Sequence, residues 1–267
     1  MKSTTEPALY HLQTVGSTNA WCKERFAGLE DGAAVWADAQ TAGRGRLGRA
    51  WQNAPGEALY YTVVFKRPFA QPASLPLAVS LETAAALRVE FGAACAVKWP
   101  NDLLLGGKKL VGILCEGVPG GIVCGIGVNL RQSRQYFEAA GLPHAASLES
   151  EGAAPPPDAA ARLAAALSAR FAPGGPLEAF CSRGFAAIRP EYQKVCVNLG
   201  RPVEFEGGRG VAEAVDAEGR LVVRTEAGTA AVFTGEVSVR GIYGGCETRA
   251  QKQQRRSESC FLRFTES

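Results

Sequence analysis

The middle of the chain carries a series of short apolar segments separated by turn residues. Residues 97–130 read VKWPNDLLLGGKKLVGILCEGVPGGIVCGIGVNL. Within this run, Gly106-Gly107 is typical of a tight hairpin turn, since such turns need positive φ angles that glycine adopts readily. Neighbouring short strands joined in this way favour an antiparallel or mixed sheet. We predict its strands over 97–99, 103–105, 110–116 and 122–130.

Strands and helices on either side of this run complete an α+β fold. Aromatic and β-branched residues predict further strands over 33–38 and 58–65. Ser17-Thr18-Asn19 offers N-cap side chains for a helix that follows. Alanine- and leucine-rich segments with interspersed charges suit helices packed on a sheet. We therefore predict a mixed or antiparallel sheet with flanking helices, the helices covering 20–29, 75–91, 158–171 and 177–187.

The texture of the sequence changes near Gly200. Short β-type runs punctuated by glycine follow at 202–206, 210–216, 220–225, 229–234 and 236–240. Their spacing predicts a small barrel of about 45 residues that packs on its neighbour. From Cys246 onward the chain is polar and basic, which favours disorder. The predicted organisation is a larger domain over 1–198, a small β domain over 199–245 and a tail over 246–267.

The length and composition of the chain are typical of a folded protein and do not favour a general nucleic-acid binder. The chain has 267 residues, of which 46% are hydrophobic, and its formal net charge is +3. Such a mild charge does not favour a general nucleic-acid binder, so any cationic function is expected to be local. No run approaches the roughly 20 apolar residues that span a bilayer, and the start lacks a signal-peptide core. We expect a cytoplasmic protein without a membrane partner.

The eight cysteines show no paired metal-ligand spacing. Only His11 and His144 could join them as nitrogen ligands, so a zinc site is not expected. Because we expect the chain in the cytoplasm, we predict reduced thiols.

A glycine- and arginine-rich run stands out at residues 43–51, GRGRLGRAW. Glycines let the backbone approach a ligand closely while the arginines beside them bind an anionic group. Trp51 adds a flat apolar face that can cover a purine or another organic ring. The same pattern alone is equally typical of a solvated turn. Gln40 and Trp51, on either side of the run, favour the binding site.

The run KWPND at 98–102 and the lysine pair Lys108-Lys109 are the other candidates for chemistry. Asp102 could orient a magnesium-phosphate group, although Asn101 and Asp102 could also cap a turn through side-chain hydrogen bonds to the backbone. Lys109 precedes a predicted strand that would hold it rigidly against a phosphate or carboxylate. An exposed lysine pair at a hairpin is otherwise ordinary edge charge.

Taken in order, these segments resemble biotin protein ligases, which activate biotin with ATP and attach it to a lysine of a carrier domain. Each motif alone is weak, whereas six in sequence order are specific, and together they span most of residues 9–244. The motifs are Ser17-Thr18-Asn19, Gln40 with residues 42–46 (AGRGR), residues 98–102 (KWPND), residues 108–114 (KKLVGIL), residues 125–129 (GIGVN) and residues 235–240 (GEVSVR).

The resemblance implies a class II synthetase-like catalytic domain with a C-terminal SH3-like barrel. It implies that ATP and biotin, with Mg²⁺, form biotinyl-5'-AMP and pyrophosphate. A biotin carboxyl carrier protein or domain would then accept biotin on a lysine. Many members carry an N-terminal helix-turn-helix, but only 16 residues precede Ser17, so no DNA partner is expected. A homodimer through an exposed sheet edge is a further expectation.

The resemblance also implies roles for single residues. Lys109, Arg44 and Arg46 would be catalytic, neutralising the biotin carboxylate and the α-phosphate. Asp102 would hold Mg²⁺ with the ATP phosphates. The nucleotide would contact Trp51, Asn101, Asn129 and Arg240. Biotin would contact Ser17, Thr18, Asn19, Gln40, Arg44, Gly45, Arg46, Lys109 and Gly112.

Two alternatives remain at this point. A lipoate-protein ligase shares the related fold and the adenylate route, but the loop at 43–46 together with residues 98–102 resembles the biotin branch. A nucleic-acid-binding regulator would instead use Arg44, Arg46 and Arg49 on phosphate backbones.

Overall fold

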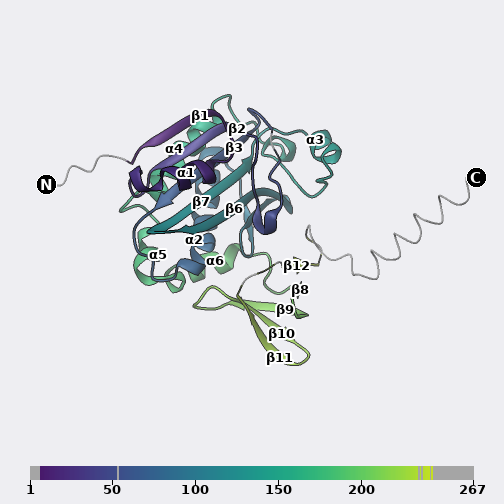
Figure 1. Ribbon diagram of the computed structural model, residues 1–267. Coiled ribbons are helices and arrows are strands. Elements are labelled where there is room, and N and C mark those ends of the chain that lie inside the picture. Colours follow the sequence, from purple (N-terminus) through teal and green to yellow (C-terminus); the bar gives the residue numbers. More distant parts are fainter. Residues whose placement is uncertain (1–6, 53, 234, 236, 241, 243–267) are drawn as a thin grey trace, which may run out of the picture.

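The computed structural model describes residues 7–52, 54–233, 235, 237–240 and 242. A large α/β body and a small β unit make up this part of the chain, and the small unit lies beside the end of the body that carries α6 (Figure 1). The predicted boundaries at 198 and 245 stay predictions, and the predicted tail, 246–267, lies outside the described residues.

A mixed sheet forms the centre of the body, as predicted, and it has seven strands. Its order is β1-β2-β3-β7-β6-β5-β4, in which β1 and β2 are parallel and all other neighbours are antiparallel. Gly106 and Gly107 both have positive φ in the tight turn between β5 and β6, which confirms the hairpin. The strands are β1 (Leu9–Val15), β2 (Ala34–Gln40), β3 (Ala58–Phe65), β4 (Ala96–Lys98), β5 (Asp102–Leu105), β6 (Lys108–Val118) and β7 (Gly121–Asn129).

Helices cover both faces of this sheet. Cys22 of α1 packs with Val64 and Val123 on one face, whereas α2 and α4 belong to the larger apolar cluster on the other. Because both faces are covered, every residue of β3 is buried. The helices are α1 (Thr18–Arg25), α2 (Leu75–Phe91), α3 (Arg134–Ala139), α4 (Ala159–Phe171), α5 (Glu178–Arg183) and α6 (Arg189–Val195).

The sequence-based elements differ from the structure in a few places. The helix predicted over 177–187 is divided, because Gly184 has a φ of 67° and ends α5. Strand β1 was not predicted. It is an edge strand with mostly exposed side chains, so it lacks the apolar pattern that reveals a buried strand. The short helices α3 and α6 were missed for the same lack of a long apolar repeat.

The small unit is a five-stranded antiparallel sheet of order β11-β10-β9-β8-β12. Its five strands confirm the predicted β runs, although the described strands form an open sheet rather than a closed barrel. Val203, Ala212 and Val223 join the apolar cluster of the body, so the two units share a core. The strands are β8 (Pro202–Phe205), β9 (Gly208–Val215), β10 (Leu221–Thr225), β11 (Gly228–Val232) and β12 (Ser238–Val239).

Trp99 joins the two units. Its backbone N–H donates to Asn198 Oδ1 at 2.8 Å, and its indole N–H donates to the carbonyl of Gly219 at 3.0 Å. The ring is 2% exposed. The KWPND run that carries site residues is therefore anchored to the chain segments that lead into and through the small unit.

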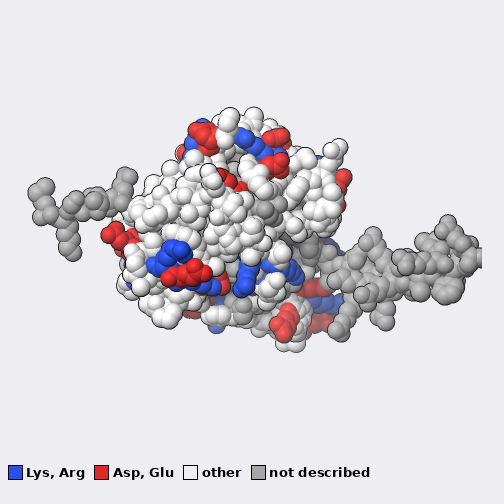
Figure 2. Space-filling view, turned by 45° about the horizontal axis from the view of Figure 1, so that its top comes forward, with Lys and Arg blue, Asp and Glu red and all other residues white. Residues whose placement is uncertain are grey.

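Charged side chains of both signs are interspersed on the molecular face in Figure 2, with broad uncharged areas between them. This mixture agrees with the mild net charge of the sequence. None of the helices in the described part of the chain has the length and apolar character that a bilayer crossing requires.

The prediction that all eight cysteines are reduced is wrong for one pair. Cys115 of β6 and Cys124 of β7 form a disulfide in the structure. The strand register places these two residues directly opposite each other, which the spacing of nine residues in the sequence did not reveal. The four other cysteines in the described ranges are buried free thiols, and Cys246 and Cys260 lie outside those ranges.

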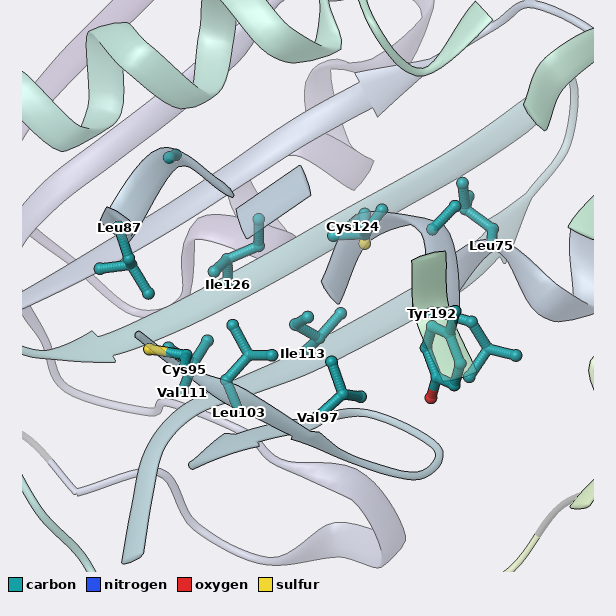
Figure 3. Close-up of a cluster of buried hydrophobic side chains, with 14 of the residues drawn as sticks. Leu75, Leu87, Cys95, Val97, Leu103, Val111, Ile113, Cys124, Ile126 and Tyr192 are labelled. Carbon is teal, nitrogen blue, oxygen red and sulfur yellow. The ribbon is translucent and has the colours of Figure 1, made fainter. Parts of the chain in front are cut away.

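Tyr61 and Tyr192 are both buried in the large apolar cluster, where Figure 3 shows Tyr192. They differ in the hydrogen bonding of their hydroxyl groups. Tyr61 Oη lies 3.0 Å from Ser168 Oγ, whereas Tyr192 Oη has no hydrogen-bond partner among the described residues. Burial raises the pKa of Tyr192 well above its ordinary value, so the hydroxyl stays neutral.

We expect Tyr61→Phe to lower the free energy of unfolding by about 1 kcal/mol, because it leaves Ser168 without its partner. Tyr192→Phe is expected to leave stability unchanged or to raise it, since no hydrogen bond is lost and a buried hydroxyl is removed. Urea unfolding of both variants measures this difference. Equal destabilisation by the two substitutions would contradict it.

Candidate active site

A cavity of about 510 Å³ opens on the α1 side of the sheet. Its floor is formed by β6 and β7, and the segment that follows β2 contributes to its wall. Every predicted site residue except Arg240 lines it, although these residues come from distant parts of the sequence. The residues brought together are Ser17, Thr18, Asn19, Gln40, Arg44, Gly45, Arg46, Trp51, Asn101, Asp102, Lys109, Gly112 and Asn129.

The floor of the cavity is bare backbone at its centre. Gly112 and Gly127 are directly paired across β6 and β7. A Cβ atom added at Gly112 would lie 2.6 Å from the Trp51 ring, and one added at Gly127 would lie 2.5 Å from it. The indole therefore rests on these two strands only because both positions are glycine.

A buried hydrogen-bond network closes one end of the cavity. The Thr18 N–H donates to Gln40 Oε1 at 2.8 Å, which joins the start of α1 to the end of β2. Thr62 of β3 donates its hydroxyl to Asn19 Oδ1 at 2.7 Å. Asn19 Nδ2 in turn donates to Glu116 Oε2 at 2.8 Å. These bonds hold the amides of Asn19 and Gln40 in fixed orientations at the cavity wall.

Glu116 keeps its charge beside this network. Burial raises the pKa of the Glu116 carboxyl, but hydrogen bonds from Lys23 and Asn19 outweigh burial and hold the pKa below its ordinary value. An ionised carboxylate can only accept, so it orients the Asn19 amide with Nδ2 toward itself. Sequence reasoning missed both Glu116 and Thr62. A threonine among the aromatic and aliphatic residues of 58–65 was the signal that could have revealed Thr62.

The glycine- and arginine-rich run forms a closed loop over the cavity. A β-bridge joins Arg44 to Ala50, and the Gly45 N–H donates to the carbonyl of Arg49 at 2.7 Å. Leu47 lies at the tip, 70% exposed and with a φ of 55°. Arg46 donates to Asn101 Oδ1 at 2.7 Å and to the carbonyl of Gly235 at 3.0 Å. Arg46 thus joins the loop to the KWPND run and to the small unit.

Lys109 and Asp102 form an ion pair in the cavity. Lys109 Nζ lies 2.7 Å from Asp102 Oδ1 and 5.7 Å from the centre of the Trp51 ring. The described residues hold no group of three His, Cys, Asp or Glu side chains suited to a metal ion. A single carboxylate nevertheless fits Mg²⁺, because this ion is commonly bound by one or two carboxylates together with substrate phosphates.

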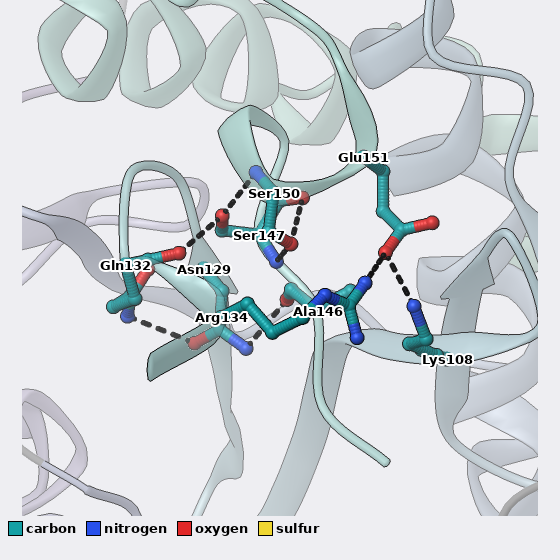
Figure 4. A network of polar contacts seen from close by, with 8 residues as sticks. All are labelled: Lys108, Asn129, Gln132, Arg134, Ala146, Ser147, Ser150 and Glu151. Carbon is teal, nitrogen blue, oxygen red and sulfur yellow. Dashed lines mark hydrogen bonds and ion pairs between the residues drawn. The ribbon is translucent and has the colours of Figure 1, made fainter. Parts of the chain in front are cut away.

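The far end of the cavity carries a second amide network (Figure 4). Gln132 Nε2 donates to Asn129 Oδ1 at 3.1 Å, and Asn129 Nδ2 donates to the carbonyl of Ala146 at 2.9 Å. Ser147 Oγ donates to the Gln132 carbonyl at 2.7 Å. Sequence reasoning missed Gln132, because a polar residue after a strand ordinarily indicates a loop.

The structure does not bring Arg240 into this cavity. Arg240 follows β12 and lines a separate concavity of the small unit, together with Glu204, Arg209 and Arg224. In the described arrangement of the small unit, Arg240 lies outside the cavity. Its contact with the nucleotide therefore stays a prediction.

Comparisons with known proteins identify the family. Residues 10–133 match the Biotin/lipoate A/B protein ligase family, and residues 199–240 match the Biotin protein ligase C terminal domain. A Biotin--[acetyl-CoA-carboxylase] ligase of Paracoccus denitrificans is 34% identical over 254 residues, which cover 85% of this chain and 98% of that protein. The chain belongs to the biotin protein ligase family.

Other biotin protein ligases extend this result. A Biotin--[acetyl-CoA-carboxylase] ligase of Mycobacterium tuberculosis is 33% identical, with 83% of this chain and 85% of that protein covered. The structure of the biotin protein ligase from Aquifex aeolicus in complex with biotin and ATP matches with a TM-score of 0.73 at 29% identity, covering 87% of this chain and 98% of that one.

The paired glycines of the floor generate a test that needs no ligand. We expect Gly127→Ala to displace the Trp51 indole, because the new Cβ would overlap the ring. The contribution of Trp51 to the fluorescence, obtained by comparison with a Gly127→Ala/Trp51→Phe double variant, should shift to longer wavelength as the ring becomes exposed. Gly117→Ala on the same sheet is the control, since its Cβ would meet nothing within 4 Å. An unchanged Trp51 signal in Gly127→Ala would contradict the packing described here.

Proposed function

We propose that this chain activates biotin with ATP to biotinyl-5'-AMP and then transfers biotin to a lysine of a biotin carboxyl carrier protein or domain. The observation that carries the proposal is the order of chemistry along one cavity. Fixed amides lie at one end, cations and the Trp51 ring lie at the centre, and a second amide network lies at the other end. This order matches a ligand with a ureido ring, two reacting anionic groups and a purine.

The polar end suits the ureido ring of biotin. A ureido group has both N–H donors and a carbonyl acceptor, so its burial requires matched partners. Ser17, Thr18, Asn19 and Gln40 supply hydroxyls and amides there, and all four are buried. The bare backbone of Gly112 would let the ring and its tail lie close to the sheet after the Trp51 indole, which packs there, has moved aside.

The cations at the centre of the cavity would lower the main barrier to adenylate formation, which is the repulsion between two anions. A biotin carboxylate oxygen forms a bond to the α-phosphorus of ATP while the bond to pyrophosphate breaks, and both partners begin as anions. Lys109, Arg44 and Arg46 would neutralise them and hold them in line. For this, Lys109 would exchange its contact with Asp102 for the ligand, and Arg46 would leave Asn101 and Gly235. Asp102 would then be available to Mg²⁺ bound by the ATP phosphates, where the metal supplies further positive charge.

The remaining roles concern the nucleotide and the second step. Trp51 would flank the adenine, and Asn101 and Asn129 would contact the nucleotide. The loop at 43–50 would cover the mixed anhydride and exclude water until the carrier arrives. The amine of the carrier lysine then attacks the carbonyl carbon, and AMP leaves. Arg240 would reach ATP only after a movement of the small unit.

We place the reaction in the cytoplasm, where ATP is supplied. We also propose a homodimer that uses an exposed edge of the sheet, for which β1 is a candidate because it is an edge strand with exposed side chains.

Lys109 and its neighbour Lys108 form a matched pair for testing the central step. Lys108 is paired with Glu151 at 2.8 Å and does not line the cavity. We expect Lys109→Ala to reduce biotin-dependent exchange of labelled pyrophosphate into ATP by about 100-fold or more, since it removes a cation from the reacting centre. Lys108→Ala is expected to stay within about threefold of wild type. Undiminished exchange in Lys109→Ala would contradict the assigned role.

Biotin and lipoate distinguish the leading function from its nearest alternative. We expect biotin to raise the melting temperature and lipoate to leave it unchanged, because the fixed amides at the polar end match a ureido ring. Stabilisation by lipoate alone would reverse the assignment. The nucleic-acid-binding alternative predicts salt-dependent DNA binding without biotin, and the mixed charge on the face in Figure 2 does not favour it.

A further inference from the structure

Gln132 has a buried hydrogen-bond acceptor that nothing in the described structure satisfies. The residue is 2% exposed, and its Nε2 donates to Asn129, whereas its Oε1 has no hydrogen-bond partner among the described residues. Buried polar atoms in proteins are rarely left unpaired, and an exception at a cavity is a reason to look for a ligand group. Gln132 lines the cavity of the active site.

The orientation of this amide follows from a backbone group. The carbonyl of Ala146 can only accept, so Asn129 must present Nδ2 to it and Oδ1 to Gln132. Asn129 Oδ1 can likewise only accept, so Gln132 must present Nε2 to Asn129. Turning the Gln132 amide over would set two oxygens against each other. Oε1 is therefore the atom that Gln132 has left for another partner, and Ser147 holds the backbone of Gln132 in place (Figure 4).

The position of Gln132 along the cavity indicates which part of a ligand it meets. Gly125, Gly127 and Asn129 alternate along one face of β7, and they lie respectively beside Asn19, Trp51 and Gln132. From Gly125 to Asn129 the strand extends about 13 Å. Gln132 is thus at the end opposite the polar network of Asn19. Apolar and aromatic side chains surround this end, namely Tyr136, Phe137 and Leu142.

We propose that Gln132 Oε1 accepts a hydrogen bond from the 6-amino group of the purine and makes this chain select ATP over 6-keto purine nucleotides. The proposal rests on the function proposed above. A flat base between aromatic and apolar side chains is held by packing, which does not distinguish one purine from another. An acceptor fixed by a hydrogen-bond network does distinguish them. It pairs with an amino group, whereas a 6-keto oxygen would face it with a second acceptor.

Three nucleotides test this selection in the wild-type protein. ATP carries the 6-amino donor, purine riboside triphosphate carries hydrogen at that position, and inosine triphosphate carries the keto oxygen. With saturating biotin and Mg²⁺, we expect kcat/KM for pyrophosphate exchange to fall in that order, with ATP favoured over inosine triphosphate by about tenfold or more. Equal use of ATP and inosine triphosphate by the wild type would overturn the proposal, whatever the variants do.

The Gln132→Met variant separates selection from general support of the fold. We expect it to bring the three nucleotides to within about twofold of one another, mainly through a higher KM for ATP, with the KM for biotin unchanged. Gln193→Met is the matched control. Gln193 lies on α6, away from the cavity, and its Oε1 accepts a hydrogen bond from the N–H of Val215 in β9. This variant should keep the wild-type ratio. A loss of equal proportion for all three nucleotides in Gln132→Met would show a structural role and would overturn the proposal.

A thermal-shift series with the same three nucleotides and Mg²⁺ separates this proposal from the proposed function. Absence of biotin-dependent exchange in the wild type would remove the proposed function. The order of the three nucleotides in the thermal shifts would still decide the role of Gln132, with stronger stabilisation by ATP supporting it and equal stabilisation overturning it.

Discussion

The register of β6 against β7 is the constraint on which the site depends. It sets Gly112 opposite Gly127, so that a strip of bare backbone runs across the centre of the cavity floor. Trp51 packs on this strip at distances that a methyl group would not allow. A shift of β7 by one residue along β6 would turn the opposite face of β7 toward the cavity and remove Gly127 from the floor. The same register sets Cys115 against Cys124, and Cys124 belongs to the apolar cluster on the opposite face of the sheet.

Fixed polar groups occupy the two ends of this floor. At one end, the Glu116 carboxylate orients Asn19, and Gln40 receives the backbone N–H of Thr18. At the other, the carbonyl of Ala146 orients Asn129 and, through it, Gln132. Each network contains a group that can only accept a hydrogen bond, namely the Glu116 carboxylate or the Ala146 carbonyl. This group fixes the orientation of the side-chain amides bonded to it, without any ligand. Between the two ends, Lys109 is paired with Asp102, and Arg46 donates to Asn101 and to the carbonyl of Gly235.

Much of the fold was predictable because its elements have strong local signals. The helix over 75–91 was predicted with its bounds, since its long Ala- and Leu-rich run ends at Gly92, which adopts the left-handed conformation. Strand β3 was predicted over its full length from its aromatic and β-branched residues. Strand β1 was not, because an exposed edge strand paired to a distant partner carries little apolar pattern of its own. The candidate site followed from six short motifs in order rather than from any one of them.

By itself, the sequence determined the type and order of most elements and many of the residues that meet in the cavity, because these depend on local pattern and on motifs. Only the tertiary structure decided what those residues contact. It joined Arg46 to Asn101 and Gly235, added Thr62, Glu116 and Gln132 to the site, and left Arg240 on the small unit. The physical reason is that hydrogen bonds and ion pairs between residues far apart in the chain depend on strand register and packing, which no local stretch of sequence records.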